Sequence, residues 1–378
     1  MKSKRKLFYK VLFILLVLFI LGLFLPKYVQ RYFYWNFADI YDSEKFPKVE
    51  IKNDPNNVSL LAKRPANFEF VVPEKFYDRN ENLTFETFIE DHDAVALLVL
   101  KRDTIIYENY FDEFNETYNL PSFSVSKSFV SALTGIAIDE GYIYSTKQSI
   151  TFFLKELGSE FNAVSIEDLL NMRSGIEFNE GYTNPFADMP KYYYGTDLLK
   201  YVKDLKVEDA PDLHYNYISV NTLLLGQIIE RATNTKLNNY LEKKIWIPAG
   251  MESEASWNVD SEEHETIKAF CCINAVARDF ARFGLIYLHD GYWNNRQIVP
   301  AEWVKRSTSI INDSRDSQNY PYTYQWRVLE NGAFFAKGIL GQYILVYPEK
   351  ELVFVRLGKS VGDLDWADLF ISLSDQIN

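Results

Sequence analysis

Ser124 and Lys127 are the two residues of this sequence best placed to do chemistry together. They lie three positions apart in the stretch from 121 to 142, PSFSVSKSFVSALTGIAIDEGY. At a helix start this spacing puts both side chains on one face, close enough to touch. A serine hydroxyl becomes a nucleophile when a neighbouring base takes its proton, and a lysine can do so as the neutral amine. The pair therefore predicts acyl transfer, with the free N–H groups of the helix start available to an oxyanion.

The spacing alone does not establish such a site. Ser3 and Lys6 repeat it in the basic N-terminal stretch, and a polar helix start is the ordinary structural explanation. The helix itself is well supported, because apolar residues recur at three- and four-residue intervals between 130 and 138 and Gly141 follows as a stop signal. The chemistry therefore depends on what the rest of the chain places around this helix.

The elements expected around the helix indicate an α+β fold. Two apolar runs between 94 and 110, separated by Lys-Arg-Asp, predict a β-hairpin. Helical patterns follow at 165–173, 222–232, 237–245 and 276–287. Strand patterns return at 322–329, 334–337, 342–347 and 352–357, before a closing helix at 363–377. We expect one antiparallel sheet formed from both chain ends, flanked by helices, with a helical lobe inserted.

The N-terminus carries a basic start followed by a continuous apolar run. Residues 8–26 are long enough to predict a membrane anchor, and the positive-inside rule places the body outside the cytoplasm, in a periplasmic or extracellular space. No pair of small residues follows the run, so we expect an uncleaved signal anchor, with cleavage as the alternative. The chain is expected to divide into a tail and anchor (1–33), an extension strapped on the body (34–80) and a catalytic domain (81–378).

Composition excludes several classes of partner. The net charge is −12, and residues 1–31 contain no acids, so the body is more acidic than the whole chain. Such a body repels nucleic acid. The cysteines are the neighbours Cys271 and Cys272, which we expect to be small buried core residues rather than a strained disulfide. No zinc-ligand spacing occurs, and we expect neither a metal nor a cofactor.

Five blocks of the chain, over roughly residues 90–360, resemble the serine β-lactamase-related superfamily. That superfamily includes class C β-lactamases, D-Ala-D-Ala carboxypeptidases, family VIII esterases and 6-aminohexanoate-dimer hydrolases. In chain order the blocks are SFSVSKSFVSALTGIAIDEGYI, SIEDLLNMRSGIEF, YISVNTLLLGQIIERAT, INAVARDFARFGLIYLHDGYW and AKGILGQYILVYPEKELVFVRLG. The resemblance implies the β-lactamase/transpeptidase-like fold and a serine hydrolase.

The resemblance also implies a role for each residue of the site. Ser124 matches the acylated nucleophile, and Lys127 matches the base or proton shuttle beside it. Tyr217 matches a second general acid/base, which activates water or protonates the leaving group. Tyr215 competes for this role, but Tyr217 fits better because the Leu-Leu-Gly at 224–226 then falls at the family's distance.

The last block departs from the family pattern. Ala336-Lys337-Gly338 stands where β-lactamases carry Lys-Thr-Gly, and strand alternation is expected to point Lys337 to the opposite face from its two neighbours. Gly338 still permits close approach of a substrate backbone, and the N–H of Ile339 is expected to complete an oxyanion hole with that of Ser124. The departure favours an esterase or amide hydrolase over a true β-lactamase, and the block resembles the 6-aminohexanoate-dimer hydrolase branch.

Ser219, expected to contact substrate, is a second departure, because a hydroxyl replaces the usual asparagine and makes fewer contacts to a substrate amide. Arg278 and Asp279 are expected to be structural, pairing or capping at a helix start. We expect a membrane-anchored serine hydrolase acting on a small-molecule ester or amide or a cell-wall-derived substrate. The alternative is a non-hydrolysing, penicillin-binding-like sensor for cell-wall fragments.

Overall fold

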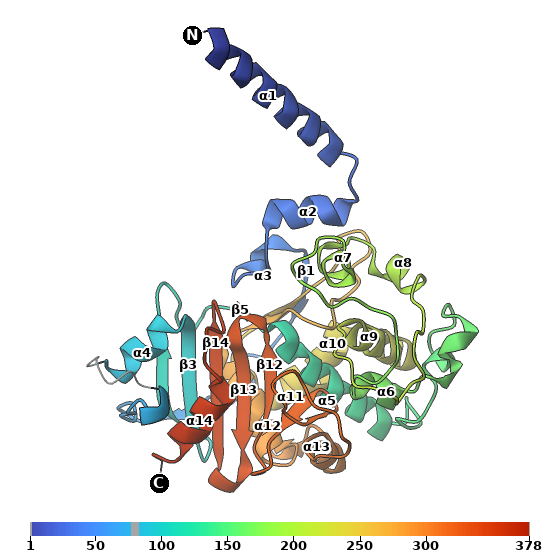
Figure 1. Ribbon diagram of the computed structural model, residues 1–378. Coiled ribbons are helices and arrows are strands. Elements are labelled where there is room, and N and C mark those ends of the chain that lie inside the picture. Colours follow the sequence, from blue (N-terminus) through green and yellow to red (C-terminus); the bar gives the residue numbers. More distant parts are fainter. Residues whose placement is uncertain (1, 77–82, 378) are drawn as a thin grey trace.

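The early hairpin and the late strands come together in one sheet. The computed structural model describes residues 2–76 and 83–377, and within them this sheet has eight strands (Figure 1). In sheet order they are β10 (Tyr322–Thr323), β11 (Trp326–Val328), β12 (Phe334–Gly338), β13 (Gln342–Tyr347), β14 (Leu352–Gly358), β3 (Ala94–Lys101), β4 (Thr104–Tyr110) and β2 (Ala62–Lys63). The last strand, β14, pairs antiparallel with the first strand of the hairpin, β3. The expected antiparallel sheet from both chain ends is therefore confirmed.

A second, smaller sheet was not expected from the sequence. Its order is β1 (Lys48–Ile51), β6 (Ala255–Asn258), β7 (Ile273–Ala275) and β5 (Leu120–Pro121). These strands are two to four residues long, too short to show alternation. The sheet matters because it joins the segment before Ser124 to two segments that lie far away in the sequence. A further small hairpin pairs β8 (Tyr292–Trp293) with β9 (Arg296–Gln297).

Helices pack on both faces of the large sheet (Figure 1). The helices of the described residues are α1 (Lys2–Gly22), α2 (Lys27–Trp35), α3 (Asp42–Lys45), α4 (Phe85–Asp91), α5 (Ser126–Asp139), α6 (Ile166–Leu170), α7 (Asp188–Tyr194), α8 (Leu198–Val202), α9 (Val220–Thr233), α10 (Leu237–Leu241), α11 (Ile247–Ala249), α12 (Ala277–Leu288), α13 (Ala301–Ser307) and α14 (Trp366–Ser374). The expected cap Ser165 is confirmed by a reciprocal capping box with Asp168, although α6 ends earlier than expected. The helix expected over 237–245 continues past α10 as a π-helical turn, Glu242–Trp246.

Alternation along the central strands divides the core into two layers. In β14, Val353 and Val355 face the cluster formed with α5, α9 and α12, whereas Leu352 and Phe354 face the cluster formed with α4 and α14. Because both faces of these strands are covered, they read as nearly continuous apolar runs. The layer between the sheet and α5 is the one that holds the site.

The prediction of a single strand over 322–329 is wrong, because the segment forms two strands. Tyr324 and Gln325 have φ values of 41° and 70°, and the chain reverses there so that β10 and β11 pair as a tight hairpin. Turns with positive φ usually carry glycine or asparagine. Because this turn has neither, no residue in the sequence marks the position where the chain reverses.

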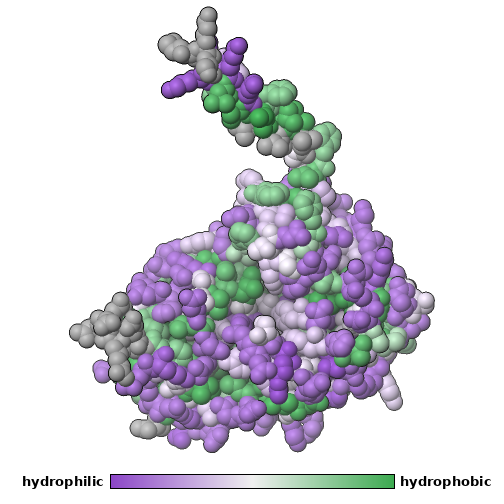
Figure 2. Space-filling view, in the orientation of Figure 1, coloured by the Kyte–Doolittle hydropathy of each residue, from purple (hydrophilic) through white to green (hydrophobic). Residues whose placement is uncertain are grey.

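The apolar N-terminal run also differs from expectation. The helix begins at Lys2 and ends at Gly22, and a bend separates it from α2 at Lys27, so residues 8–26 are not one helix. Among the described residues, no helix combines the length and the apolar character that crossing a bilayer requires, and the transmembrane helix is not confirmed. Figure 1 shows α1 projecting from the body, and Figure 2 shows apolar side chains along it.

Asp279 holds the loop after α11 to the start of α12. Its carboxylate pairs with Arg282 at 2.6 Å and accepts from the backbone N–H of Glu252 at 2.7 Å and of Ser253 at 3.0 Å, with both paired side chains fully buried. We expect Asp279→Ala to lower the free energy of unfolding by about 3 kcal/mol, because it leaves a buried guanidinium without one of its partners. Chemical denaturation measures this. Asp363→Ala, at an exposed position, is the control, and an equal effect of both variants would contradict the structural role.

Candidate active site

Ser124 lies in a short turn held at the edge of the small sheet. The preceding strand β5 pairs with β7, and the N–H of Ser122 donates to the carbonyl of Ile273 at 2.8 Å. Phe123–Val125 then form one 3₁₀ turn that leads into α5, with Phe123 at a φ of 44°. This turn directs Ser124 into a cleft, while both of its neighbours are buried.

The amine of Lys127 is buried and makes three hydrogen bonds. Its Nζ donates to Oγ of Ser124 at 2.9 Å, to Oγ of Ser219 at 3.3 Å and to the carbonyl of Phe270 at 2.7 Å. The residue is 1% exposed. These bonds account for all three protons of an ammonium group. The structure therefore brings the predicted nucleophile and the predicted base into direct contact.

The carbonyl of Phe270 is presented by a tight turn that contains both cysteines. The structure joins Cys271 and Cys272 in a disulfide, so the expectation of two unbonded thiols is wrong, whereas their burial is confirmed. The backbone is held around them by Nε1 of Trp257, which donates to the carbonyl of Cys271 at 2.7 Å. This ordered turn brings the two adjacent sulfurs together, which the sequence could not show.

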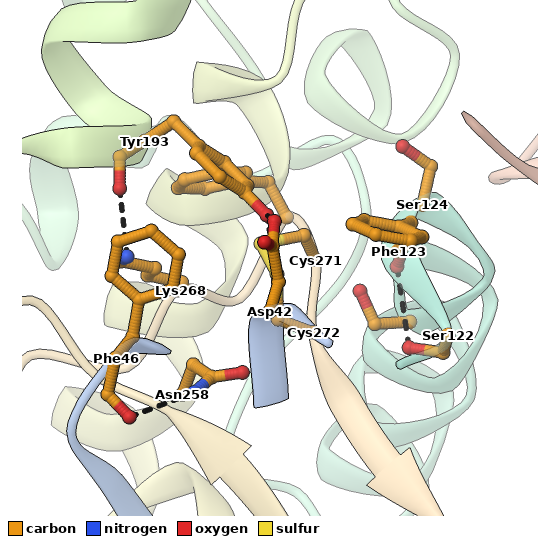
Figure 3. Close-up of a disulfide and its surroundings, with 12 residues drawn as sticks. Asp42, Phe46, Ser122, Phe123, Ser124, Tyr193, Asn258, Lys268, Cys271 and Cys272 are labelled. Atoms are coloured by element: carbon orange, nitrogen blue, oxygen red, sulfur yellow. Dashed lines mark hydrogen bonds between the residues drawn. A yellow bond between two sulfur atoms is a disulfide. The ribbon is translucent and has the colours of Figure 1, made fainter. Parts of the chain in front are cut away.

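Figure 3 shows this disulfide with a buried polar group beside it. Nζ of Lys268 donates to the carbonyl of Tyr193 at 2.7 Å and lies 3.6 Å from the centre of the Phe46 ring. Burial holds the pKa of Lys268 well below its ordinary value. The hydroxyl of Tyr193 donates to Asp42 of the N-terminal extension. The extension thus contacts the turn that positions the amine of Lys127.

Tyr217, rather than Tyr215, lies beside the amine. Nζ of Lys127 is 5.1 Å from the centre of the Tyr217 ring, and the guanidinium of Arg327 is 5.8 Å from it. The ring of Tyr215 instead packs against Tyr322, and burial raises the pKa of its phenol. Arg327 is itself fixed by a 2.5 Å ion pair with Asp316. The geometry thus favours Tyr217, although its catalytic role stays a prediction.

Ser219 leads to a carboxylate that the sequence did not reveal. Its backbone N–H donates to Oε2 of Glu180 at 2.7 Å, and its hydroxyl donates to Oε1 at 2.6 Å. The hydroxyl of Tyr182 donates to the same oxygen at 2.9 Å. Burial raises the pKa of Glu180, against the opposing effects of the Lys127 charge and of these hydrogen bonds. Glu180 lies in an irregular loop, where neither spacing nor periodicity marks it.

Gly338 ends β12 against the turn that carries the nucleophile. A Cβ at this position would lie 2.6 Å from the carbonyl oxygen of Ser122 and 3.1 Å from the backbone nitrogen of Ser124. Only a residue without a side chain allows this approach. Ile339 follows directly, and both Ile339 and Ser124 line the same cleft. The predicted oxyanion hole is compatible with this geometry and stays a prediction.

The residues next to Gly338 behave as strand alternation requires. Ala336 packs into the core on the α5 side, whereas the amine of Lys337 lies on the other face, 5.7 Å from the Tyr343 ring, and hydrogen-bonds to Gln318. Lys337 nevertheless lines the cleft. Burial and the nearby charge of Arg327 lower the pKa of Lys337 to about 8.

The cleft has a volume of about 630 Å³, which suits a small molecule. It is lined by Ser124, Glu180, Tyr182, Tyr215, Asn216, Tyr217, Arg315, Asp316, Ser317, Arg327, Lys337, Gly338, Ile339, Leu340 and Val361. Within the described ranges, no group of three or more histidine, cysteine and acidic side chains is arranged to hold a metal ion. The paired hydroxyl and amine at the wall of this cleft can support acyl transfer.

Comparison with known proteins shows which family of sequences this chain matches. A sequence model of the β-lactamase family matches residues 84–369. A 6-aminohexanoate-dimer hydrolase of Paenarthrobacter ureafaciens is 27% identical over 294 residues, which cover 72% of this chain and 74% of that protein.

Solved structures share the fold. A Bacillus anthracis protein provisionally described as a 6-aminohexanoate-dimer hydrolase superposes with a TM-score of 0.78 at 22% identity, over 92% of this chain and 94% of that one. A class C β-lactamase superposes with a TM-score of 0.58 at 16% identity, over 78% of this chain and 94% of that one. The expected β-lactamase/transpeptidase-like fold is confirmed.

The close approach at Gly338 can be tested by adding one methyl group. We expect Gly338→Ala to lower kcat/KM for a nitrophenyl ester about 100-fold, because the methyl group pushes the turn at Ser124 away from its working position. Gly332→Ala is the control, since a Cβ there meets no atom within 4 Å, although its φ of 80° costs some stability. Unchanged kcat/KM in folded Gly338→Ala would show that the contact does not position the nucleophile.

Proposed function

The chain belongs to the β-lactamase family of serine hydrolases, and we propose that it cleaves an amide or ester bond of a small substrate through an acyl-enzyme on Ser124. The observation that carries the proposal is the 2.9 Å hydrogen bond between Nζ of Lys127 and Oγ of Ser124 at the wall of an open cleft. A lysine in that position can take the proton of the hydroxyl that attacks.

In the acylation step, Oγ of Ser124 attacks the substrate carbonyl carbon while its proton passes to the neutral amine of Lys127. The N–H groups of Ser124 and Ile339 are the donors proposed to stabilise the developing oxyanion. Tyr217 lies beside the amine and is the group proposed to carry the proton to the leaving amine or alcohol. The bond from the carbonyl carbon to the leaving group then breaks, and the acyl group stays on Ser124.

In the second step water hydrolyses this ester. The same groups act in reverse order: Tyr217 and Lys127 take the proton of water, and Oγ of Ser124 recovers a proton as it leaves. The cleft is open to solvent on the side lined by Arg315 and Ser317, both exposed residues, so water has access.

Two observations support the proposed substrate class: the relatives of the chain, and the departure from the family pattern at Ala336-Lys337-Gly338. The P. ureafaciens relative is named for hydrolysis of a 6-aminohexanoate dimer, and we extend a comparable small-amide or ester substrate to this chain. Ala336 replaces the cation that β-lactamases place on this strand, and it is buried in the core. This argues against dedicated recognition of a β-lactam carboxylate at that position. A cell-wall-derived amide remains within the proposed class.

The nucleophile can be tested with a fluorophosphonate probe and a nitrophenyl ester. We expect Ser124→Ala to abolish labelling and to lower turnover by about 1,000-fold or more, since of the two hydroxyls bonded to the lysine, those of Ser124 and Ser219, that of Ser124 lines the cleft. Ser131→Ala is a matched control: it removes a buried hydroxyl of α5 that lacks a hydrogen-bond partner among the described residues.

Undiminished labelling of Ser124→Ala would refute the proposal. The same preparation separates hydrolase from sensor when it is incubated with a penicillin and measured by intact mass. A stable adduct that releases no product, together with no turnover of any ester or amide, would favour the non-hydrolysing sensor.

We also propose that α1 attaches the body to a membrane, with the body on the non-cytoplasmic side. Phe8, Phe13 and Ile14 are 63%, 65% and 56% exposed on a helix that projects from the body, and lysines and an arginine precede them. An exposed apolar stretch of this kind is an expected site of association with lipid.

Fractionation of cells that make the full chain tests this attachment. We expect the wild-type chain in the membrane fraction and Phe13→Glu/Ile14→Glu largely in the soluble fraction, because each carboxylate opposes burial in lipid. Leu60→Glu, at a residue of the body that is 77% exposed, is the control and should stay with the membrane. Recovery of the wild-type chain in the soluble fraction would contradict the proposal.

A further inference from the structure

The reactive form of Lys127 needs an acceptor for one of its protons. In the structure its amine donates three hydrogen bonds, to Ser124, Ser219 and the carbonyl of Phe270, which is the pattern of an ammonium. An ammonium has no lone pair and cannot take the proton of Ser124. The carbonyl of Phe270 accepts a hydrogen bond but does not accept a proton. Among the described residues that the amine contacts, Ser219 is the one bonded to a group that can accept a proton, the carboxylate of Glu180.

Ser219 connects the amine to Glu180 in one continuous path. Its Oγ accepts from Nζ of Lys127 at 3.3 Å and donates to Oε1 of Glu180 at 2.6 Å. Glu180 is fixed by two further donors, the N–H of Ser219 at 2.7 Å and the hydroxyl of Tyr182 at 2.9 Å. Ser219 is 1% exposed, and the path is therefore closed to bulk water at its centre.

We propose that Glu180 takes a proton from Lys127 through the hydroxyl of Ser219 and so generates the neutral amine. This inference rests on the proposed function. One proton passes from Nζ of Lys127 to Oγ of Ser219, and the hydroxyl proton of Ser219 passes to Oε1 of Glu180. An ammonium and a carboxylate become an amine and a carboxylic acid, with no change in net charge. The amine then takes the proton of Ser124. Glu180 is a positioning residue, because it acts through Ser219 and Lys127.

The surroundings lower the free-energy cost of this proton transfer. Burial disfavours both charged partners, and it raises the pKa of Glu180 even though the Lys127 charge opposes the shift. The other titratable groups facing the path are Tyr182 and Tyr217, with Arg327 beyond the Tyr217 ring. The charge of Arg327 is offset by its ion pair with Asp316 at 2.5 Å.

The path also explains the hydroxyl at position 219. A hydroxyl both accepts and donates through one oxygen, so it can pass a proton from one neighbour to the other. The asparagine expected by resemblance lacks this property, because its amide nitrogen only donates and its oxygen only accepts. Ser219 is therefore matched to the presence of Glu180 in the facing loop.

The rate of fluorophosphonate labelling as a function of pH tests the proposal on the full chain. The probe reports how readily Ser124 is deprotonated, and no deacylation step is involved. We expect a level rate across neutral pH for the wild type, because the neutral amine is reached within the pair without loss of a proton to solvent. For Glu180→Gln we expect labelling at least tenfold slower at pH 7 that rises about tenfold per pH unit, as Lys127 must then titrate with solvent.

Two variants of the bridge and one control complete the experiment. Ser219→Ala should give the same steep profile as Glu180→Gln, whereas Ser219→Thr, which keeps the hydroxyl, should recover the level profile. Glu177→Gln, at an exposed residue of the same loop, should match the wild type. If Glu180→Gln does not fold, Ser219→Ala decides the question with the carboxylate still present.

The failures are distinguishable. A Glu180→Gln profile that stays level, or a rate lowered equally at every pH, would overturn the proton transfer and leave Glu180 a structural residue. Labelling of the wild type that does not require Ser124 would instead overturn the proposed function.

Discussion

The burial of one amine is the constraint on which the site depends. A lysine that is 1% exposed must find partners for its N–H groups, because burying an unpaired ammonium costs several kcal/mol. The chain supplies three partners: Ser124 in the adjoining turn before α5, and two from distant segments, the N-terminus of α9 and the carbonyl of Phe270. In the proposed mechanism these partners act as nucleophile, bridge and anchor. Under that proposal, the interactions that allow the amine to be buried also prepare it to react.

The small sheet provides the precision that this arrangement needs. Strand β5 brings the chain to Ser124, and its neighbour β7 begins directly after the turn that presents Phe270. The nucleophile and one partner of the amine are therefore fixed to the same two strands. A short, rigid connection of this kind holds reacting groups more accurately than a loop alone. The disulfide between Cys271 and Cys272 lies within the same turn and adds a covalent restraint to it.

The N-terminal extension is part of this support. Strand β1 adds to the small sheet. Asp42 accepts from the hydroxyl of Tyr193, and the carbonyl of Tyr193 accepts from the buried Lys268 at the start of the turn. In addition, the hydroxyl of Tyr32 donates to the carbonyl of Thr183 at 3.2 Å, in the loop that carries Glu180. The segment between the apolar helix and the body thus contacts both the turn and the loop that surround Lys127.

The sequence by itself determined the parts whose signals are local. The spacing of Ser124 and Lys127, the helix behind them, the hairpin from 94 to 110 and the last strands all follow from periodicity and stop signals over short windows. The blocks in order also pointed to the family and the fold.

Tertiary structure alone decided the rest. Glu180 is one acid among many on an acidic chain, and only the folding of its loop against α9 buries it beside Ser219. The strands of the small sheet are too short to show alternation. The turn that brings the two cysteine sulfurs together is held by the indole N–H of Trp257, a residue distant in the sequence. Local sequence patterns extend over short windows of residues. They cannot show which distant residues become buried together or bond to one another, because that depends on how the whole chain folds.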